Sequence, residues 1–156
     1  LAAAGEVDLV MLPEPNVTSV LMNNADFREA LDVTELFGQA AEKAGQGGTV
    51  LSMGCVIARK DFVQQNPEKV AAFMDAYAAS VAFVNGDVEA ASVLVEEQGI
   101  LPKAAVAARA IPNCHIVFIE GEEMKAQIEP FFQMLYDANP ASVGGALPGE
   151  DFYYAR

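Results

Sequence analysis

The chain has 156 residues, of which 53% are hydrophobic, and this is enough to bury a substantial core in about one domain. Its formal net charge of −13 would repel a phosphate backbone, so we expect no nucleic-acid partner. Charged or polar residues interrupt every long apolar run, so the sequence predicts no direct membrane span.

The first residues predict the end of a helix, a strand and a new helix. Gly5 is typical of the position just past a helix end. The sequence lacks an initiator Met and a signal-peptide pattern, so we expect a piece of a longer protein that has lost a signal or lipid anchor. The apolar run at 7–12 predicts a buried strand of a parallel sheet. Asn16 predicts the cap of a helix that ends near Asn23.

The next segment predicts two strands separated by a helix and a turn. Residues 30–33 predict a short edge strand, and residues 34–43 have weak helical character. The glycine-rich stretch at 45–48 predicts a turn, because no Lys-Ser/Thr pair of a phosphate-binding loop follows it. Residues 49–58 form the clearest predicted strand, in which Gly54 indicates a bulge or a close approach of another backbone.

The remainder of the chain is predicted to be mainly helical. Pro67 after Asn66 is typical of a helix start, and an apolar stripe at helical spacing, expected to be core, follows at Val70, Phe73, Tyr77, Val81 and Val84. Further helices are predicted over 88–98, 102–110 and 121–135, with a strand at 116–119 and aromatic rings at 152–154 that hold the last segment. Strands followed by helices indicate an α/β protein whose sheet is incomplete within this chain.

Residues with reactive side chains are few. Cys55 and Cys114 are too few for a disulfide scaffold, and we expect free thiols. His115 is the only histidine, so no metal site is predicted. Adjacent side chains of a strand point to opposite faces, so Cys114 and His115 cannot act as a nucleophile and base. We therefore predict no catalytic residue, no metal and no cofactor.

Five segments carry a resemblance to a known family. They are residues 5–15 (GEVDLVMLPEP), 30–35 (ALDVTE), 53–62 (MGCVIARKDF), 66–70 (NPEKV) and 147–154 (LPGEDFYY). In this order they resemble segments of the solute-binding proteins of ABC importers for sulfonates, taurine, nitrate and thiamine precursors. No single segment is diagnostic, and the resemblance depends on all five in register.

The resemblance implies a two-lobed α/β fold of the type II periplasmic-binding kind, present here only in part. Residues 1–50 would be the C-terminal part of lobe 2, residues 51–60 a hinge-crossing strand, and residues 61–156 the C-terminal helical part of lobe 1. The implied function is capture of a small organic solute or anion and its delivery to the membrane subunits of an ABC permease. The implied location is extracytoplasmic, either in the periplasm or lipid-anchored at the outer face of the membrane, and the protein would not be an enzyme.

The implied cleft between the lobes gives candidate ligand-binding residues in two segments. They are Glu14, Pro15 and Asn16 after the first strand, and Ser52, Met53 and Gly54 in the hinge strand. Glu14 would accept from an amine or hydroxyl of the ligand, or would belong to a plain turn. A helix cap is favoured for Asn16, and Met53 is also consistent with core packing.

Two other classes of protein remain as alternatives. The effector domain of a transcription regulator shares the implied fold, and the sequence upstream of Leu1 would decide between the two. An enzyme of thiamine-pyrimidine synthesis also shares it, but one histidine and two cysteines do not supply the residues that this chemistry uses.

Overall fold

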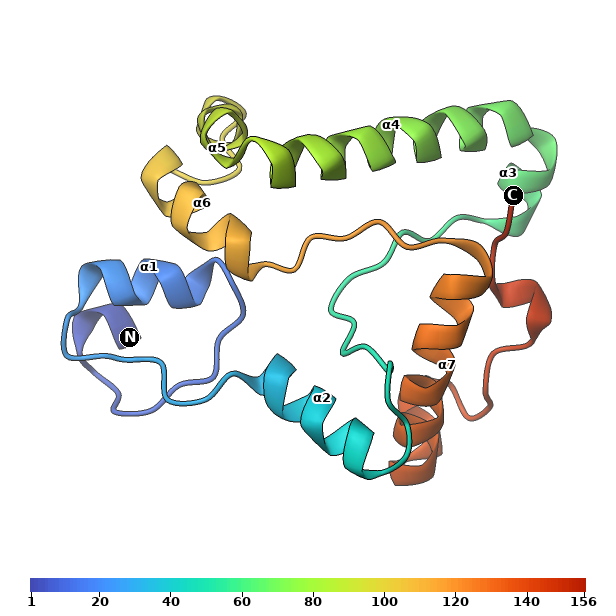
Figure 1. The fold of residues 1–156 in the computed structure, drawn as a ribbon, viewed down its shortest axis with the longest axis horizontal. Helices are drawn as coiled ribbons and strands as arrows, with labels where there is room; N and C mark the ends of the chain where they lie inside the picture. The colour runs from blue at the N-terminus through green and yellow to red at the C-terminus, as the bar shows by residue number, and fades with distance from the viewer. The chain divides into compact units, whose positions relative to one another are not determined.

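A computed structural model describes all residues, 1–156, and shows a helical chain without a β-strand (Figure 1). Helices account for 60% of the residues. The α-helices are α1 Asn16–Asn23, α2 Val33–Lys43, α3 Lys60–Gln65, α4 Pro67–Gly86, α5 Val88–Glu97, α6 Ala104–Ala110 and α7 Gly121–Ala138. The 3₁₀ helices are η1 Ala2–Ala4, η2 Ile111–Asn113, η3 Pro140–Val143 and η4 Glu150–Phe152.

The predicted α/β fold is wrong, because none of the four predicted strands forms. Residues 7–12, 49–58 and 116–119 are irregular and pair with no other strand. Several apolar side chains in these runs lie in solvent, with Leu9 85% exposed and Ile57 83% exposed. A β-rich apolar sequence forms a strand only where a neighbouring strand completes its hydrogen bonds and covers its side chains. These runs have the amino-acid composition of strands, but the chain provides no neighbouring strand for them to pair with.

The fourth predicted strand, at 30–33, contains a helix cap instead. The Asp32 side chain accepts hydrogen bonds from the Thr34 and Glu35 backbone N–H groups at 2.8 and 3.1 Å. These groups belong to the first turn of α2, whose amides have no partner within the helix. Asp32 therefore starts α2, and Val33 is its first residue.

The predicted helices are confirmed with small changes in their ends. The α1, α4 and α5 helices begin or end within a residue or two of the predicted positions, and α7 continues past Pro130 to Ala138. The short helix α3 was not predicted. No single helix has the length and apolar character to cross a membrane, and only α4 and α5 together, bent by 114°, meet that criterion.

The chain divides into two compact units. Unit 1 contains Leu1–Ala30 and Ala72–Phe118, and unit 2 contains Leu31–Ala71 and Ile119–Arg156. The boundary falls within α4, whose first turn belongs to unit 2 and whose remainder belongs to unit 1. The predicted division at residues 50 and 60 refers to lobes of a larger protein and stays a prediction.

Unit 1 is built on close packing of α5 against α6. Its centre is a cluster of Ala91, Ala107 and Ile111, which are at most 6% exposed. Small alanine side chains let the two helix backbones approach closely, and larger apolar residues surround them: Val84, Val88, Val95 and Leu101. The Asn85 side chain also donates to the Ile116 carbonyl oxygen at 2.8 Å, which holds the chain after η2.

The predicted core stripe of α4 is only partly correct. Val70 and Val81 are buried, but Phe73 is 48% exposed and Tyr77 is 38% exposed. The two rings stack on each other with centroids 5.8 Å apart. The stripe thus has the predicted helical spacing, but only part of it is covered by other elements.

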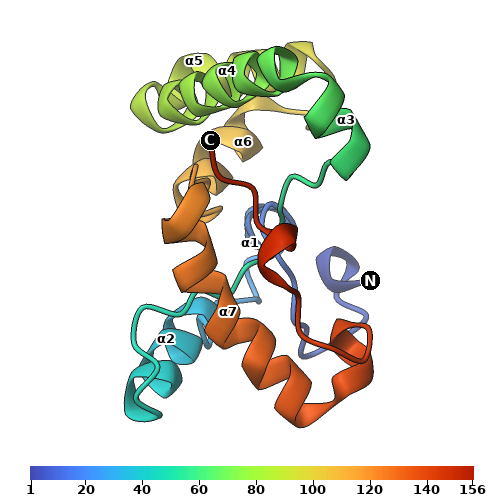
Figure 2. The same ribbon diagram turned by 90° about the vertical axis from the view of Figure 1, so that its right-hand side faces the viewer.

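Unit 2 is organised around α7 (Figure 2). The Phe37 ring of α2 meets the Phe131 ring of α7 edge to face, with centroids 5.7 Å apart. The Val50 N–H donates to the Gln127 carbonyl oxygen of α7 at 3.3 Å. On leaving α7 the chain passes through η3 to two consecutive glycines with positive φ, Gly144 at 81° and Gly145 at 88°. Residues 147–156, called the C-terminal segment below, then run back along α7.

Candidate functional site

The first group of predicted ligand-binding residues lies at the start of α1 in unit 1. Glu14 Oε2 accepts from the Thr18 backbone N–H at 3.2 Å, and Glu14 Oε1 accepts from Thr18 Oγ1 at 3.0 Å. Asn16 is the first residue of α1, and Pro15 occupies the cap position without a side-chain bond to the helix. The capping role expected of Asn16 is thus taken by the Glu14 carboxylate, which satisfies a free amide of the first turn.

The second group, Ser52, Met53 and Gly54, lies in the irregular stretch of unit 2. Ser52 Oγ donates to the Gly54 carbonyl oxygen at 3.3 Å, and Met53 is 79% exposed, so it is not core. The two groups belong to different units, and neither lines the two cavities described below. Their ligand-binding roles stay predictions from the sequence.

Cys114 and His115 directly follow η2, and the Cys114 thiol is free. Partial burial, and next the charge of Glu14, raise the pKa of the Cys114 thiol, which keeps it protonated. His115 has a positive φ of 49° just after it. No group of three His, Cys, Asp or Glu side chains is placed to hold a metal ion.

The larger cavity lies in unit 2 and has a volume of about 620 Å³. Its walls come from three segments: the turn at 45–47, residues 129–133 of α7, and the C-terminal segment. Among the lining residues, Glu129 is charged, Gln133 is polar, and Phe132 and Tyr153 are aromatic. A smaller cavity of about 410 Å³ lies in unit 1 between residues 5–9 and 24–30. We treat the larger one, called the unit-2 cavity, as the candidate site.

The turn that forms one wall of the unit-2 cavity is the end of α2. Gly45 has a φ of 76°, its N–H donates to the Glu42 carbonyl at 3.0 Å, and the Gln46 N–H donates to the Ala41 carbonyl at 2.9 Å. This pair of bonds is the Schellman arrangement, which needs a left-handed residue at the position of Gly45. The turn is therefore fixed by backbone bonds, in agreement with its prediction as a turn.

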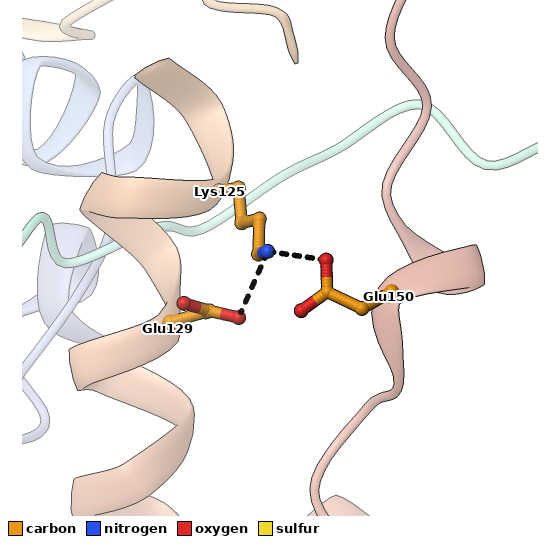
Figure 3. Close-up of polar contacts among 3 residues, drawn as sticks. All are labelled: Lys125, Glu129 and Glu150. Carbon is orange, nitrogen blue, oxygen red and sulfur yellow. Dashed lines mark hydrogen bonds and ion pairs between the residues drawn. The ribbon is translucent and has the colours of Figure 1, made fainter. Parts of the chain in front are cut away.

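A lysine lies between two carboxylates, one of which, Glu129, lines the cavity (Figure 3). Lys125 Nζ lies 2.5 Å from Glu150 Oε2 and 4.0 Å from Glu129 Oε1. The hydrogen bond to Glu150 is the main reason that the pKa of Lys125 is raised above 10.5, and the charges of Glu150, Glu129 and Glu122 add to it.

Tyr153 joins the lysine to an aromatic group on the C-terminal segment. Lys125 Nζ lies over the Tyr153 ring, 5.7 Å from its centroid. The Phe152 ring contacts the Tyr153 and Phe132 rings edge to face, with centroids 5.3 and 6.1 Å away. Partial burial, followed by the Glu129 charge, raises the pKa of the Tyr153 phenol. The phenol therefore stays neutral at physiological pH.

Two further ion pairs fasten the C-terminal segment to unit 2. Lys60 is the first residue of α3, and its Nζ lies 2.6 Å from Asp151 Oδ2. Arg156 Nε and Nη2 both donate to Glu120 Oε1, at 3.2 and 3.1 Å. Because this segment supplies Leu147, Pro148 and Tyr153 to the cavity, the ion pairs hold one of its walls.

The sequence predicted that rings at 152–154 would hold the last segment, but it gave no reason to connect them with Glu129. One signal was present: Lys125, Glu129 and Gln133 recur every four residues and so share one face of α7. No protein-family model matches the chain, and neither a curated protein nor a solved structure matches it.

Proposed function

We propose that the chain binds a small organic solute and serves as the solute-binding component of an ABC importer. The observation that carries the binding part is the unit-2 cavity. Its volume of about 620 Å³ lies within the range of small-molecule sites, about 300–1,000 Å³. It also combines apolar rings with a few polar groups, as such sites do.

The importer part of the proposal rests on the resemblance of the five sequence segments. The two-lobed α/β fold that this resemblance implies is not part of the proposal, because the chain forms no strand. Delivery to the membrane subunits of a permease and an extracytoplasmic location are proposed on the same sequence basis.

Solute binding is tested by thermal unfolding of the full chain against a panel of thiamine precursors, sulfonates, nitrate and small amines. A bound solute stabilises the folded chain by mass action, so one member should raise Tm in a concentration-dependent manner. Absence of a shift with every member would contradict solute binding.

The importer role needs a separate test in cells that encode the protein. Deletion of its gene should reduce uptake of the solute that raises Tm, and restoration of the gene should return it. Uptake at the same rate with and without the gene would contradict the importer role and leave binding untouched.

A further inference from the structure

We propose that the unit-2 cavity selects an organic cation, a small ammonium compound with a flat apolar body. This inference rests on the proposed function and names the class of its solute. It differs from the anions that the family resemblance includes.

Glu129 is the only charged side chain in the cavity wall. Lys125 hydrogen-bonds to Glu150 at 2.5 Å and stands 4.0 Å from Glu129, at the limit of an ion pair. The Glu129 carboxylate is therefore less neutralised than that of Glu150, and it is 47% exposed on the cavity side of α7. A ligand ammonium would complete the pairing of Glu129.

Phe132 and Tyr153 both line the cavity. Aromatic faces attract cations within about 6 Å of the ring centroid, and Lys125 already occupies such a position over Tyr153 at 5.7 Å. Rings next to a carboxylate suit a flat apolar body that carries a positive charge.

The cavity wall contains no cationic side chain to pair with an anion. No arginine lines the cavity, and the one nearby lysine is held by Glu150. The Gly45 and Gln46 amides, which would be donors in the turn, are used by the carbonyls of α2. An anion would meet the Glu129 carboxylate with no compensating donor among these groups.

Three probes of similar shape and different charge test the inference on the full chain: benzylammonium, benzyl alcohol and benzoate. Binding is measured by isothermal titration, with amide chemical shifts locating the site. We expect benzylammonium to bind most tightly and to shift resonances at residues 45–47, 129–133 and 147–153. Glu129→Gln should weaken it about tenfold, because the ligand ammonium then donates to a neutral amide oxygen in place of a carboxylate.

Glu97→Gln is the matched control, because it removes one charge from an exposed site on α5 of the other unit. It should leave benzylammonium affinity unchanged, which separates local pairing from the general negative charge of the chain. Tyr153→Phe retains the ring and should bind nearly as wild type, whereas Tyr153→Leu should bind several-fold more weakly. Circular dichroism of each variant verifies that it folds.

Equal or tighter binding of benzoate, or a Glu129→Gln affinity equal to wild type, would overturn the cation inference. The same holds if no probe binds while a solute of the thermal panel raises Tm, and solute binding would then stand. If neither the probes nor the panel bind, the proposed function fails as well.

Discussion

Lys125 of α7 donates a hydrogen bond of 2.5 Å to the Glu150 carboxylate, 25 residues further along the chain. This bond joins the C-terminal segment to the face of α7 that borders the unit-2 cavity. The lysine side chain is 18% exposed and the glutamate side chain 85% exposed, so the pair lies at the edge of the protein. Such a pair has more influence on where the segment lies than on the free energy of unfolding.

Replacement of Glu150 tests this attachment. Glu150→Gln should lower the pKa of Lys125 toward its usual value of 10.5, because its largest stabilising contact is lost. Amide exchange of residues 147–154 should become faster, with little change in Tm. Lysine titration by NMR and hydrogen exchange measure both effects. Glu122→Gln, which acts on Lys125 by charge alone, should produce a smaller pKa change and unchanged exchange.

Acid should release the contact between Lys60 and Asp151. The hydrogen bond from Lys60 holds the pKa of Asp151 below its usual value of 3.8. A carboxyl with a lowered folded pKa contributes stability that is present above the unfolded pKa and is lost as pH falls through the folded one. The contact should therefore persist from pH 7 down to about pH 4. It should break at a pH below 3.8, where the Asp151 carboxyl takes up its proton. Carboxyl chemical shifts of wild type and Asp151→Asn measure this, and loss of the contact near neutral pH would contradict it.

The small cluster of unit 1 should be sensitive to a cavity. Ile111→Ala removes a side chain that is 6% exposed and packed on Ala91 and Ala107. We expect a loss of about 2–5 kcal/mol in the free energy of unfolding, because the packed contacts are not replaced. Ile100→Ala is the control, since Ile100 is 69% exposed. Urea unfolding compares them, and equal losses would contradict the packing described for α5 and α6.

The cap of α2 should depend on the Asp32 carboxylate. Asp32→Ala leaves the Thr34 and Glu35 amides without their acceptor and should cost about 1 kcal/mol. Asp32→Asn retains an acceptor oxygen and should cost little. Thermal or urea unfolding measures the difference. If both variants lost stability equally, the charge of Asp32 and not its capping bond would be responsible.

The irregular stretch at 51–58 should behave as exposed backbone. Its amides belong to no β-ladder, so we expect fast hydrogen exchange there and slow exchange in α5. Ile57→Ser should leave the free energy of unfolding almost unchanged, because Ile57 is 83% exposed. Slow exchange across 51–58 would indicate a strand in solution and would contradict the helical fold.

Local signals explain why the helices were predicted correctly, whereas the four strands were predicted wrongly. A few neighbouring residues determine the start of α4 at Pro67 and the end of α5 before Gly99. A strand depends on a distant partner, which the sequence of 7–12 or 49–58 does not reveal. At 30–33 a local signal was overlooked, because Asp32 followed by Glu35 is the pattern of a helix start.

The candidate site was harder to predict for a related reason. Glu129, the turn at 45–47 and Tyr153 come from segments far apart in the chain, and no short motif joins them. Glu14 was predicted as a ligand contact or as part of a plain turn, and its carboxylate accepts from Thr18 of the helix that follows it. Glu14 was a candidate ligand contact because it lies between a predicted strand and a helix, and residues that cap helices occupy the same position.

The consecutive left-handed residues Gly144 and Gly145 determine where the C-terminal wall begins. Neither glycine lines the cavity, and a methyl group at either would meet no atom within 4 Å. The obstacle to any larger residue is torsional, since φ values of 81° and 88° disfavour a Cβ. A mutational scan for affinity would thus find losses at Gly144 and Gly145, although neither residue touches the solute. These losses would be mistaken for lost recognition unless the backbone preference of glycine were considered.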